Sequence, residues 1–350
     1  MVLSYRVLRP IQSTFINKSV YSRAATTLTT KRISSILPTT VPKFVRIVEV
    51  GPRDGLQNEK SLVPAATKLA LIDKLYKAGL RSIEAGAFVS PKWVPQMADT
   101  VEIFKTLKEK QAANEYPGAT FSALTPNLQG LEKAISLGVK EVAVFGAASE
   151  TFSKTNINCS IEESLDRFKI VCDTALANNI KVRGYVSCVL GCPYEGEISP
   201  DKVAYVAQRL LDMGCYEISL GDTIGTGAAG TTHKLLDKVL ETIPADKLAV
   251  HFHDTYGQAL SNILISLNYG IAVVDSSVSG LGGCPYAKGA SGNVATEDVV
   301  YMLNSMGIET GVNIDHLMTA GKYIDQGLTN RASQSKVHAS LSHKTPTSSK

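Results

Sequence analysis

The sequence predicts a single α/β domain built as a (β/α)8 TIM barrel. Short β-rich runs alternate with longer amphipathic runs from about residue 43 to residue 331, the pattern of parallel strands joined by helical crossovers. Eight strand candidates lie in this stretch, which is the number that closes such a barrel. No Gly-x-Gly-x-x-Gly motif follows the first strand, and its absence disfavours an open doubly wound sheet that binds a dinucleotide.

The predicted strands are short runs rich in residues that favour extended structure. They cover residues 45–50, 82–85, 120–124, 141–145, 181–187, 217–220, 248–252 and 273–278. Amphipathic runs predict helices over residues 65–78, 128–137, 161–177, 200–213 and 258–268. Four of these helices run into a glycine (Gly79, Gly138, Gly214 or Gly270), as expected where a helix ends in a left-handed residue.

The two ends of the chain differ in composition from the predicted barrel domain, residues 43–331. The first 45 residues are rich in Ser and Thr and carry seven basic side chains but no acidic one, which is typical of an organellar transit peptide. We therefore expect residues 1–42 to be a disordered targeting segment and the protein to reside in the mitochondrial matrix; a disordered basic tail is the alternative. Polar residues predict a flexible tail over residues 332–350.

Composition excludes several classes of protein. The chain of 350 residues is 44% hydrophobic and 19% charged, as in a globular protein with a sizeable core. Outside the basic N-terminal segment 29 basic residues stand against 32 acidic ones, so no nucleic-acid surface is expected. No apolar run reaches the ~20 residues that span a bilayer. The six scattered cysteines, including Cys188 and Cys192, lack zinc-site spacing, and we interpret them as mostly structural.

The first predicted strand leads to a charged pair. It runs into Gly51-Pro52-Arg53-Asp54-Gly55, and in a (β/α)8 barrel the active site lies where the strands end and the next loops begin. Arg53 and Asp54 would thus stand side by side at the barrel mouth. A helix cap or a surface ion pair is the structural alternative.

The seventh predicted strand carries two histidines. Side chains alternate along a strand, so His251 and His253 face one way while Phe252 faces the other. Two imidazoles and a carboxylate with open positions suit Mg²⁺ or Mn²⁺, and Zn²⁺ also fits. The alternative is a pair of hydrogen-bonded core histidines, but only six histidines occur in the chain, which favours metal ligation.

Further carboxylates lie at the ends of other predicted strands. Glu84 and Asp222 end the second and sixth strands, whereas the direction of Asp275 on the eighth depends on register. Any one of them could cap a helix or pair with Arg53. Their convergence on one rim favours a functional site.

A glycine-rich loop, residues 280–293, follows the last strand. Seven of its first thirteen residues are Gly or Ala, so the loop could bend and move as a lid. It carries Cys284, an exposed and reactive thiol in this interpretation; a plain connector with an incidental cysteine is the alternative. No Gly-Lys-Ser/Thr follows, which disfavours a nucleotide P-loop. Asn293 could cap the next helix or complete a metal shell.

Four segments together resemble one family. Residues 46–59, 88–97, 251–257 and 282–293 closely resemble the 3-hydroxy-3-methylglutaryl-CoA lyase family of the DRE-TIM metallolyase superfamily, and the resemblance runs from residue 45 to residue 331. The cysteine-containing lid is specific to the lyases, whereas isopropylmalate and homocitrate synthases share the barrel, the Arg-Asp pair and the His-x-His strand. Where lyases commonly have Ser before Phe-Val-Ser-Pro-Lys, this chain has Ala87, which puts a minor hydroxyl contact in doubt.

The resemblance implies metal-dependent retro-Claisen cleavage of (S)-3-hydroxy-3-methylglutaryl-CoA to acetyl-CoA and acetoacetate, in leucine catabolism and ketone-body formation, by a homodimer. Asp54, His251, His253 and Asn293 would bind Mg²⁺ or Mn²⁺. Arg53 would polarise the thioester carbonyl, and Cys284 would act from the lid. Asp54 or a metal-bound water would take the proton, with His251 also in the catalytic set. Gln57, Glu84, Asp222 and Glu297 would bind substrate or support the site.

Two rival functions stay open. The same barrel occurs in condensing acyltransferases that join acetyl-CoA to a 2-oxo acid, but those enzymes generally carry extra C-terminal regions. A catalytically silent barrel acting as a scaffold is the second rival. An inert scaffold has no physical need for Arg53, Asp54, His251, His253 and Cys284 together, so the lyase is favoured.

Overall fold

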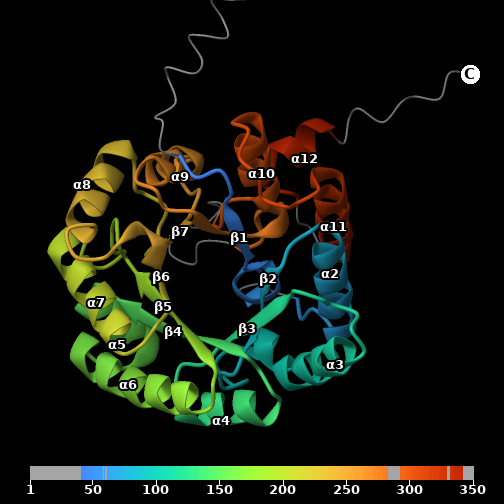
Figure 1. Ribbon diagram of the computed structural model, residues 1–350, viewed down its shortest axis with the longest axis horizontal. Coiled ribbons are helices and arrows are strands. Elements are labelled where there is room, and N and C mark those ends of the chain that lie inside the picture. Colours follow the sequence, from blue (N-terminus) through green and yellow to red (C-terminus); the bar gives the residue numbers. More distant parts are fainter. Residues whose placement is uncertain (1–40, 58, 60, 283–291, 329–331, 342–350) are drawn as a thin grey trace, which may run out of the picture. The chain divides into compact units, whose positions relative to one another are not determined.

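The computed structural model describes residues 41–57, 59, 61–282, 292–328 and 332–341. The chain divides into two compact units, residues 1–41 and 42–350, and every described residue except Val41 belongs to the second. That unit is a closed barrel of eight strands inside a ring of helices (Figure 1). The predicted (β/α)8 fold is confirmed.

The strands follow one another round the barrel in chain order, and each pairs in parallel with its neighbours. They are β1 (Arg46–Glu49), β2 (Ser82–Ala87), β3 (Thr120–Leu124), β4 (Glu141–Ala147), β5 (Lys181–Ser187), β6 (Glu217–Asp222), β7 (Leu248–Phe252) and β8 (Val273–Ser276). The barrel closes where β1 pairs with β8, with Glu49 opposite Ser276. All strand carboxyl ends therefore lie at one end of the barrel.

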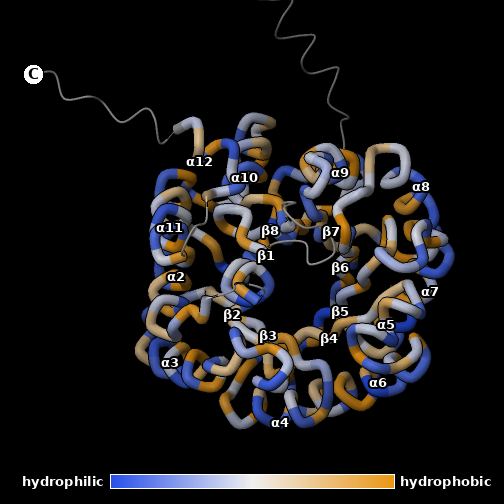
Figure 2. Tube along the Cα trace, turned by 180° about the vertical axis from the view of Figure 1, so that it is seen from behind, coloured by the Kyte–Doolittle hydropathy of each residue, from blue (hydrophilic) through white to orange (hydrophobic). Residues whose placement is uncertain are grey.

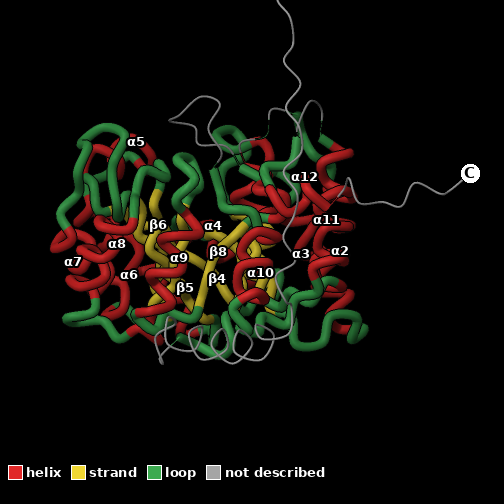
Figure 3. The backbone as a smooth tube through the Cα atoms, turned by 90° about the horizontal axis from the view of Figure 1, so that it is seen from above, coloured by secondary structure: helices red, strands yellow, loops and turns green. Residues whose placement is uncertain are grey.

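Helices surround the strands, and loops lie at both ends of the barrel (Figure 3). The helices are α2 (Ala65–Lys77), α3 (Thr100–Ala112), α4 (Leu128–Ser136), α5 (Glu150–Ile157), α6 (Ile161–Ala177), α7 (Pro200–Asp212), α8 (Ala229–Val239), α9 (Ala259–Asn268), α10 (Thr296–Ser305), α11 (Ile314–Gly327) and α12 (Lys336–Leu341). Apolar and polar residues alternate along most of them (Figure 2), which is the pattern of a helix with one face on the core.

Helix ends follow local signals in the sequence. At five helix starts the side-chain oxygen of the N-cap residue accepts a backbone N–H group. These N-cap residues are Asn127, Ser149, Ser160, Ser199 and Asn313. The glycines expected after α2, α4, α7 and α9 all have positive φ, so the predicted helix ends are confirmed. Glycine is required most clearly at Gly79, where a Cβ would lie 2.1 Å from the carbonyl oxygen of Gly311.

The structure differs from the predicted boundaries at several elements. β1 is one residue shorter than predicted at each end, and β8 is two residues shorter at its carboxyl end. β2, β4 and β6 each extend two residues beyond the predicted run, so Asp222 is the last residue of β6. Part of the expected flexible tail is instead helix α12. Its start is held by the buried carboxylate of Asp298, which accepts the Ser335 hydroxyl and the N–H groups of Lys336 and Val337 at 2.7–3.1 Å. Residues 342–350 lie outside the described residues.

Two further expectations concern composition. Within the described residues, no helix is both long and apolar enough to cross a membrane. Five cysteines fall in the described part of the chain, and all five are buried and free of disulfides, as expected for structural cysteines. Cys284 lies outside the described residues.

Candidate active site

A π-helical turn positions Arg53 and Asp54. This turn, η1 (Gly51–Gly55), is separated from β1 by Val50 alone. The carbonyl of Val50 accepts the N–H groups of Arg53 and Gly55 at 3.2 and 3.1 Å. The buried carboxylate of Glu49 accepts the N–H of Gly51 at 2.8 Å. Turns of this kind are rare and occur frequently at functional sites. The turn delivers both charged side chains to the mouth of the barrel.

Asp54 lies beside the two histidines at the end of β7. The Nε2 atoms of His251 and His253 are 3.4 Å apart, and Nε2 of His251 is 3.8 Å from Oδ2 of Asp54. One ligand atom from each residue falls within 4.8 Å of the others. Among the described residues, no other group of three His, Cys, Asp or Glu side chains is so arranged. The structure thus brings three of the four expected metal ligands together.

The charges of these residues suit a divalent cation. Burial opposes ionisation of Asp54, but the positive charge of Arg53 and the two imidazoles outweigh it and lower the pKa of Asp54 to about 2. Burial and the neighbouring His251 lower the pKa of His253 to about 4. Two imidazole nitrogens that face each other need a shared cation or proton between them, and two nitrogens plus a carboxylate oxygen are a normal donor set for a divalent metal. The residues fit the metal.

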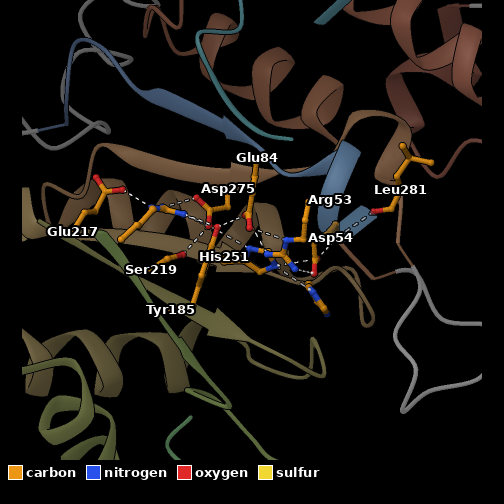
Figure 4. A network of polar contacts seen from close by, with 12 residues as sticks. Arg53, Asp54, Glu84, Tyr185, Glu217, Ser219, His251, Asp275 and Leu281 are labelled. Carbon is orange, nitrogen blue, oxygen red and sulfur yellow. Dashed lines mark hydrogen bonds and ion pairs between the residues drawn. The ribbon is translucent and has the colours of Figure 1, made fainter. Parts of the chain in front are cut away.

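Arg53 is held by two carboxylates. Its Nε and Nη2 donate to Glu84 at 2.8 and 3.1 Å, and its Nη1 donates to Oδ1 of Asp54 at 2.7 Å. Arg53 and Glu84 are both buried. Of the roles considered for Glu84, the structure shows the partnership with Arg53. Figure 4 shows the three labelled side chains facing one another.

Asn293 also lies beside Asp54. Its Nδ2 donates to Oδ2 of Asp54 at 2.8 Å and to the carbonyl of Leu281 at 3.1 Å. The N-cap of α10 is Ala295, so the helix-cap alternative for Asn293 is wrong. The described structure places Asn293 against the candidate metal cluster.

Asp222 and Glu297 hold loops at the mouth. Asp222 accepts the N–H groups of Gly225 and Gly227 at 3.1 and 2.9 Å, and burial raises its pKa to about 6. Both oxygens of Glu297 accept the N–H of Ser279, at 3.0 and 2.9 Å, and burial raises its pKa to about 8. Neither carboxylate is part of the cluster around Asp54. Both carboxylates lie where they support the loops around the site.

Two other expected site residues are less well defined. Gln57 follows the π-helical turn and is half-buried. Cys284, together with residues 283–291 of the predicted lid, lies outside the described residues. The roles of both stay predictions.

Sequence reasoning missed two side chains and left one open. Arg183 and Tyr185 on β5 point into the barrel, and Asp275 on β8 meets Arg183 there rather than at the rim. A signal was available for the first of these. A charged residue in the middle of a strand that is buried on both faces needs a partner inside the barrel.

The chain matches a known family. The family model described as HMGL-like matches residues 44–324. This chain belongs to the HMGL-like family. The HMGL-like chain is 61% identical over 298 residues to the mitochondrial hydroxymethylglutaryl-CoA lyase of Rattus norvegicus, a match covering 85% of this chain and 90% of the relative. Identity to the mitochondrial enzyme of Arabidopsis thaliana is 55% over 333 residues, covering 95% of this chain and 70% of the relative.

A solved structure agrees with this membership. The crystal structure of hydroxymethylglutaryl-CoA lyase from Pseudomonas aeruginosa matches the HMGL-like chain with a TM-score of 0.82 and 55% identity, over 88% of this chain and 100% of that one. The resemblance carried by the four sequence segments is therefore confirmed.

Proposed function

We infer that this member of the HMGL-like family is a hydroxymethylglutaryl-CoA lyase, a carbon–carbon lyase that cleaves (S)-3-hydroxy-3-methylglutaryl-CoA to acetyl-CoA and acetoacetate. One observation carries the inference. Asp54, His251 and His253 converge within 4.8 Å of one another, and Asp54 is hydrogen-bonded to Arg53. A cation site beside a guanidinium is what retro-Claisen cleavage needs, because negative charge builds on both the hydroxyl and the thioester oxygen.

Asp54, His251, His253 and Asn293 would hold the cation, which we propose to be Mg²⁺ or Mn²⁺. A bound divalent cation supplies Lewis acidity that lowers the pKa of the substrate hydroxyl. A carboxylate with a pKa of about 2 holds a cation better than it holds a proton. This favours the ligand role of Asp54 over the role of general base.

Arg53 would stabilise the enolate. Its guanidinium is fixed by Glu84 and Asp54, so it would not need to reorganise when charge develops on the thioester oxygen. Cys284 would protonate the departing carbon from the lid, residues 280–293, whose closure would keep water away from the enolate. Gln57, Asp222 and Glu297 would bind the CoA thioester or support the loops around it.

We further propose the cellular setting that the resemblance implies. Residues 1–42 would be a mitochondrial transit peptide and residues 43–331 the lyase domain, which would act in the matrix as a homodimer in leucine catabolism and ketone-body formation. The acid-free composition of the first 45 residues and the mitochondrial relatives support the location. Cell fractionation and the mass of the purified protein in solution test these points.

The test of the lyase function is release of acetoacetate from the CoA ester. We expect cleavage with Mg²⁺ or Mn²⁺ and none after chelation. His253→Ala should remove the metal-dependent activity, whereas His316→Ala, which changes an exposed histidine on α11, should retain it. Full activity of the chelated protein would reject the metal. Release of free CoA from acetyl-CoA and a 2-oxo acid, without acetoacetate release, would instead identify a condensing acyltransferase.

A further inference from the structure

Arg183 lies inside the barrel, below the candidate metal site. Its side chain is 2% exposed, and its guanidinium contacts residues of two other strands and one of its own. Nη1 and Nη2 donate to Oδ2 and Oδ1 of Asp275 at 2.9 and 2.7 Å, Nη1 donates to the Tyr185 hydroxyl at 2.9 Å, and Nε donates to Glu217 at 2.7 Å. The network runs on from Asp275 and Tyr185 to the site (Figure 4).

One arm of the network ends at a candidate metal ligand. Oδ2 of Asp275 is 3.3 Å from Nδ1 of His251 and also accepts the Ser219 hydroxyl at 2.8 Å. Both oxygens of Asp275 accept hydrogen bonds from Arg183, and Oδ2 also accepts from Ser219, so the carboxylate meets His251 as a hydrogen-bond acceptor. Nδ1 of His251 must then carry a hydrogen, which leaves the lone pair on Nε2. Nε2 is the nitrogen that faces Asp54 and His253.

The other arm ends at Arg53. Arginine has no acceptor, so the Tyr185 hydroxyl must accept from Arg183, and its single hydrogen is left to donate to Oε2 of Glu84 at 2.6 Å. Glu84 in turn accepts two N–H groups of Arg53. The ring of Tyr185 lies close to both guanidiniums, with its centroid 5.0 Å from Cζ of Arg183 and 5.8 Å from Cζ of Arg53.

We propose that Asp275, Tyr185 and Arg183 are positioning residues of the lyase site, an inference that rests on the proposed function. Asp275 fixes the tautomer and the ring orientation of His251 toward the cation, as outer carboxylates do for metal-ligating histidines. Tyr185 fixes Glu84 and, through it, Arg53. Arg183 anchors both arms and sets the direction of every hydrogen bond in them. If the network only stabilised the barrel, substitutions in its two arms would not affect metal binding and turnover separately.

The two arms predict different defects, measured on the full chain with Mn²⁺ alone and then in turnover. Asp275→Asn offers one acceptor where Arg183 and His251 need two, and an amide turned toward His251 would place the hydrogen on Nε2. We expect its Kd for Mn²⁺ to rise about 10–100-fold, with kcat at saturating Mn²⁺ within about 3-fold of wild type. Titration calorimetry or the Mn²⁺ paramagnetic resonance signal reports the Kd without any turnover.

Tyr185→Phe should show the reverse pattern, with slower turnover and nearly unchanged metal binding. The phenyl ring keeps its place beside both guanidiniums, and only the hydroxyl that connects Arg183 to Glu84 is lost. We expect kcat to fall about 10-fold, the factor that ~1.4 kcal/mol of lost stabilisation produces, while the Mn²⁺ Kd stays within about 2-fold. Arg183→Lys should show both defects.

Matched controls separate positioning from general destabilisation. Asp99→Asn removes a carboxylate paired with the buried Lys68, and Tyr269→Phe removes a hydroxyl bonded to Asp237; neither side chain is bonded to a member of the two arms. Both should leave Kd and kcat within about 2-fold. Ser219→Ala, which removes one donor to Asp275 without changing charge, replaces Asp275→Asn if that variant does not fold and should raise the Mn²⁺ Kd about 3-fold.

Several outcomes would overturn the inference. A folded Asp275→Asn or Ser219→Ala protein with the wild-type Mn²⁺ Kd would remove the role of Asp275. Equal losses of Mn²⁺ affinity and of kcat in the variants of both arms would show that the network only stabilises the fold. A wild-type protein that binds no Mn²⁺ would overturn the inference as well. Wild-type Mn²⁺ binding without cleavage of the CoA ester would defeat the proposed function while leaving the Asp275 arm standing.

Discussion

Arg53 is fixed by hydrogen bonds to two carboxylates and still has N–H donors for a substrate. Three of its five N–H donors are bonded to Glu84 and Asp54, which leaves one N–H on each terminal nitrogen for a substrate oxygen. A lysine carries the same charge on one nitrogen and cannot keep both carboxylates while reaching a third acceptor. The guanidinium shape, and not only its charge, therefore matters at this position.

Arg53→Lys should reduce kcat about 10³-fold, given what single oxyanion donors contribute. The measurement is acetyl-CoA release under saturating substrate, with circular dichroism to show that the fold is retained. Arg81→Lys, which changes an exposed arginine, should keep wild-type turnover. A kcat for Arg53→Lys within tenfold of wild type would remove Arg53 from the catalytic set.

The sequence could predict those parts of the site whose geometry depends on residues close together in the chain. Arg53 and Asp54 are neighbours at a strand end, and the alternation of a strand alone places His251 and His253 on one face. The bond between Arg183 and Asp275 joins positions 92 residues apart and depends on the register of strands that are not neighbours. No local pattern encodes that register. The sequence could therefore signal that Arg183 needs a partner inside the barrel, but not that the partner is Asp275.

The segments that follow β1 and β8 are joined through a single buried carboxylate. Oε1 of Glu49 accepts the N–H groups of Gly51 and Val278 at 2.8 Å each, and Oε2 accepts the Thr296 hydroxyl at 2.7 Å. Burial, the largest influence, nevertheless raises the pKa of Glu49 to about 7. The protonated form is therefore favoured in the folded state relative to the unfolded one.

This shift predicts how stability depends on pH. Between pH 4.5 and 7 the folded state binds more protons at Glu49 than the unfolded state does, so this group's contribution is complete below pH 4.5 and is lost as pH rises through 7, by up to ~1.4 kcal/mol per pH unit. Glu49→Gln can keep the acceptor for both N–H groups and place its amide against the Thr296 hydroxyl. It should flatten the slope seen in urea unfolding from pH 5 to pH 8.

Two comparisons make this test specific. Glu102→Gln, which changes an exposed residue of α3, should retain the wild-type slope. Some slope should remain in Glu49→Gln because the pKa of Glu297 is also raised. An unchanged slope in Glu49→Gln would show that this carboxyl ionises alike in both states.

At the scale of elements, predicted boundaries agree with the structure to within two residues wherever local signals mark them. Helix ends with a glycine in a left-handed conformation are examples, since glycine alone adopts it without cost. α12 was missed because its start is fixed by Asp298, 37 to 39 residues earlier in the chain. A polar composition cannot reveal a capping partner that only the folded barrel supplies.

The whole barrel should respond to the cation. Asp54 follows the first strand and His251 lies on the seventh, so a bound ion joins distant parts of the sheet and binds only the folded chain. At a free concentration of 100 times Kd, Mn²⁺ should add about 2.7 kcal/mol of stability and raise Tm by about 5 °C. Differential scanning calorimetry with and without chelator measures this. His253→Ala should lose the shift, and an equal shift in that variant would place the ion elsewhere.

Closure of the barrel between β1 and β8 also has a consequence in time. During synthesis Arg53 and Asp54 emerge near the beginning of the described chain, and they face no histidine until β7 has formed. Glu49 likewise cannot bind Val278 and Thr296 until the residues after β8 have been made. A nascent polypeptide that ends before β7 therefore lacks two of the three residues of the candidate metal cluster. Chemistry on a reactive thioester begins only with the finished molecule.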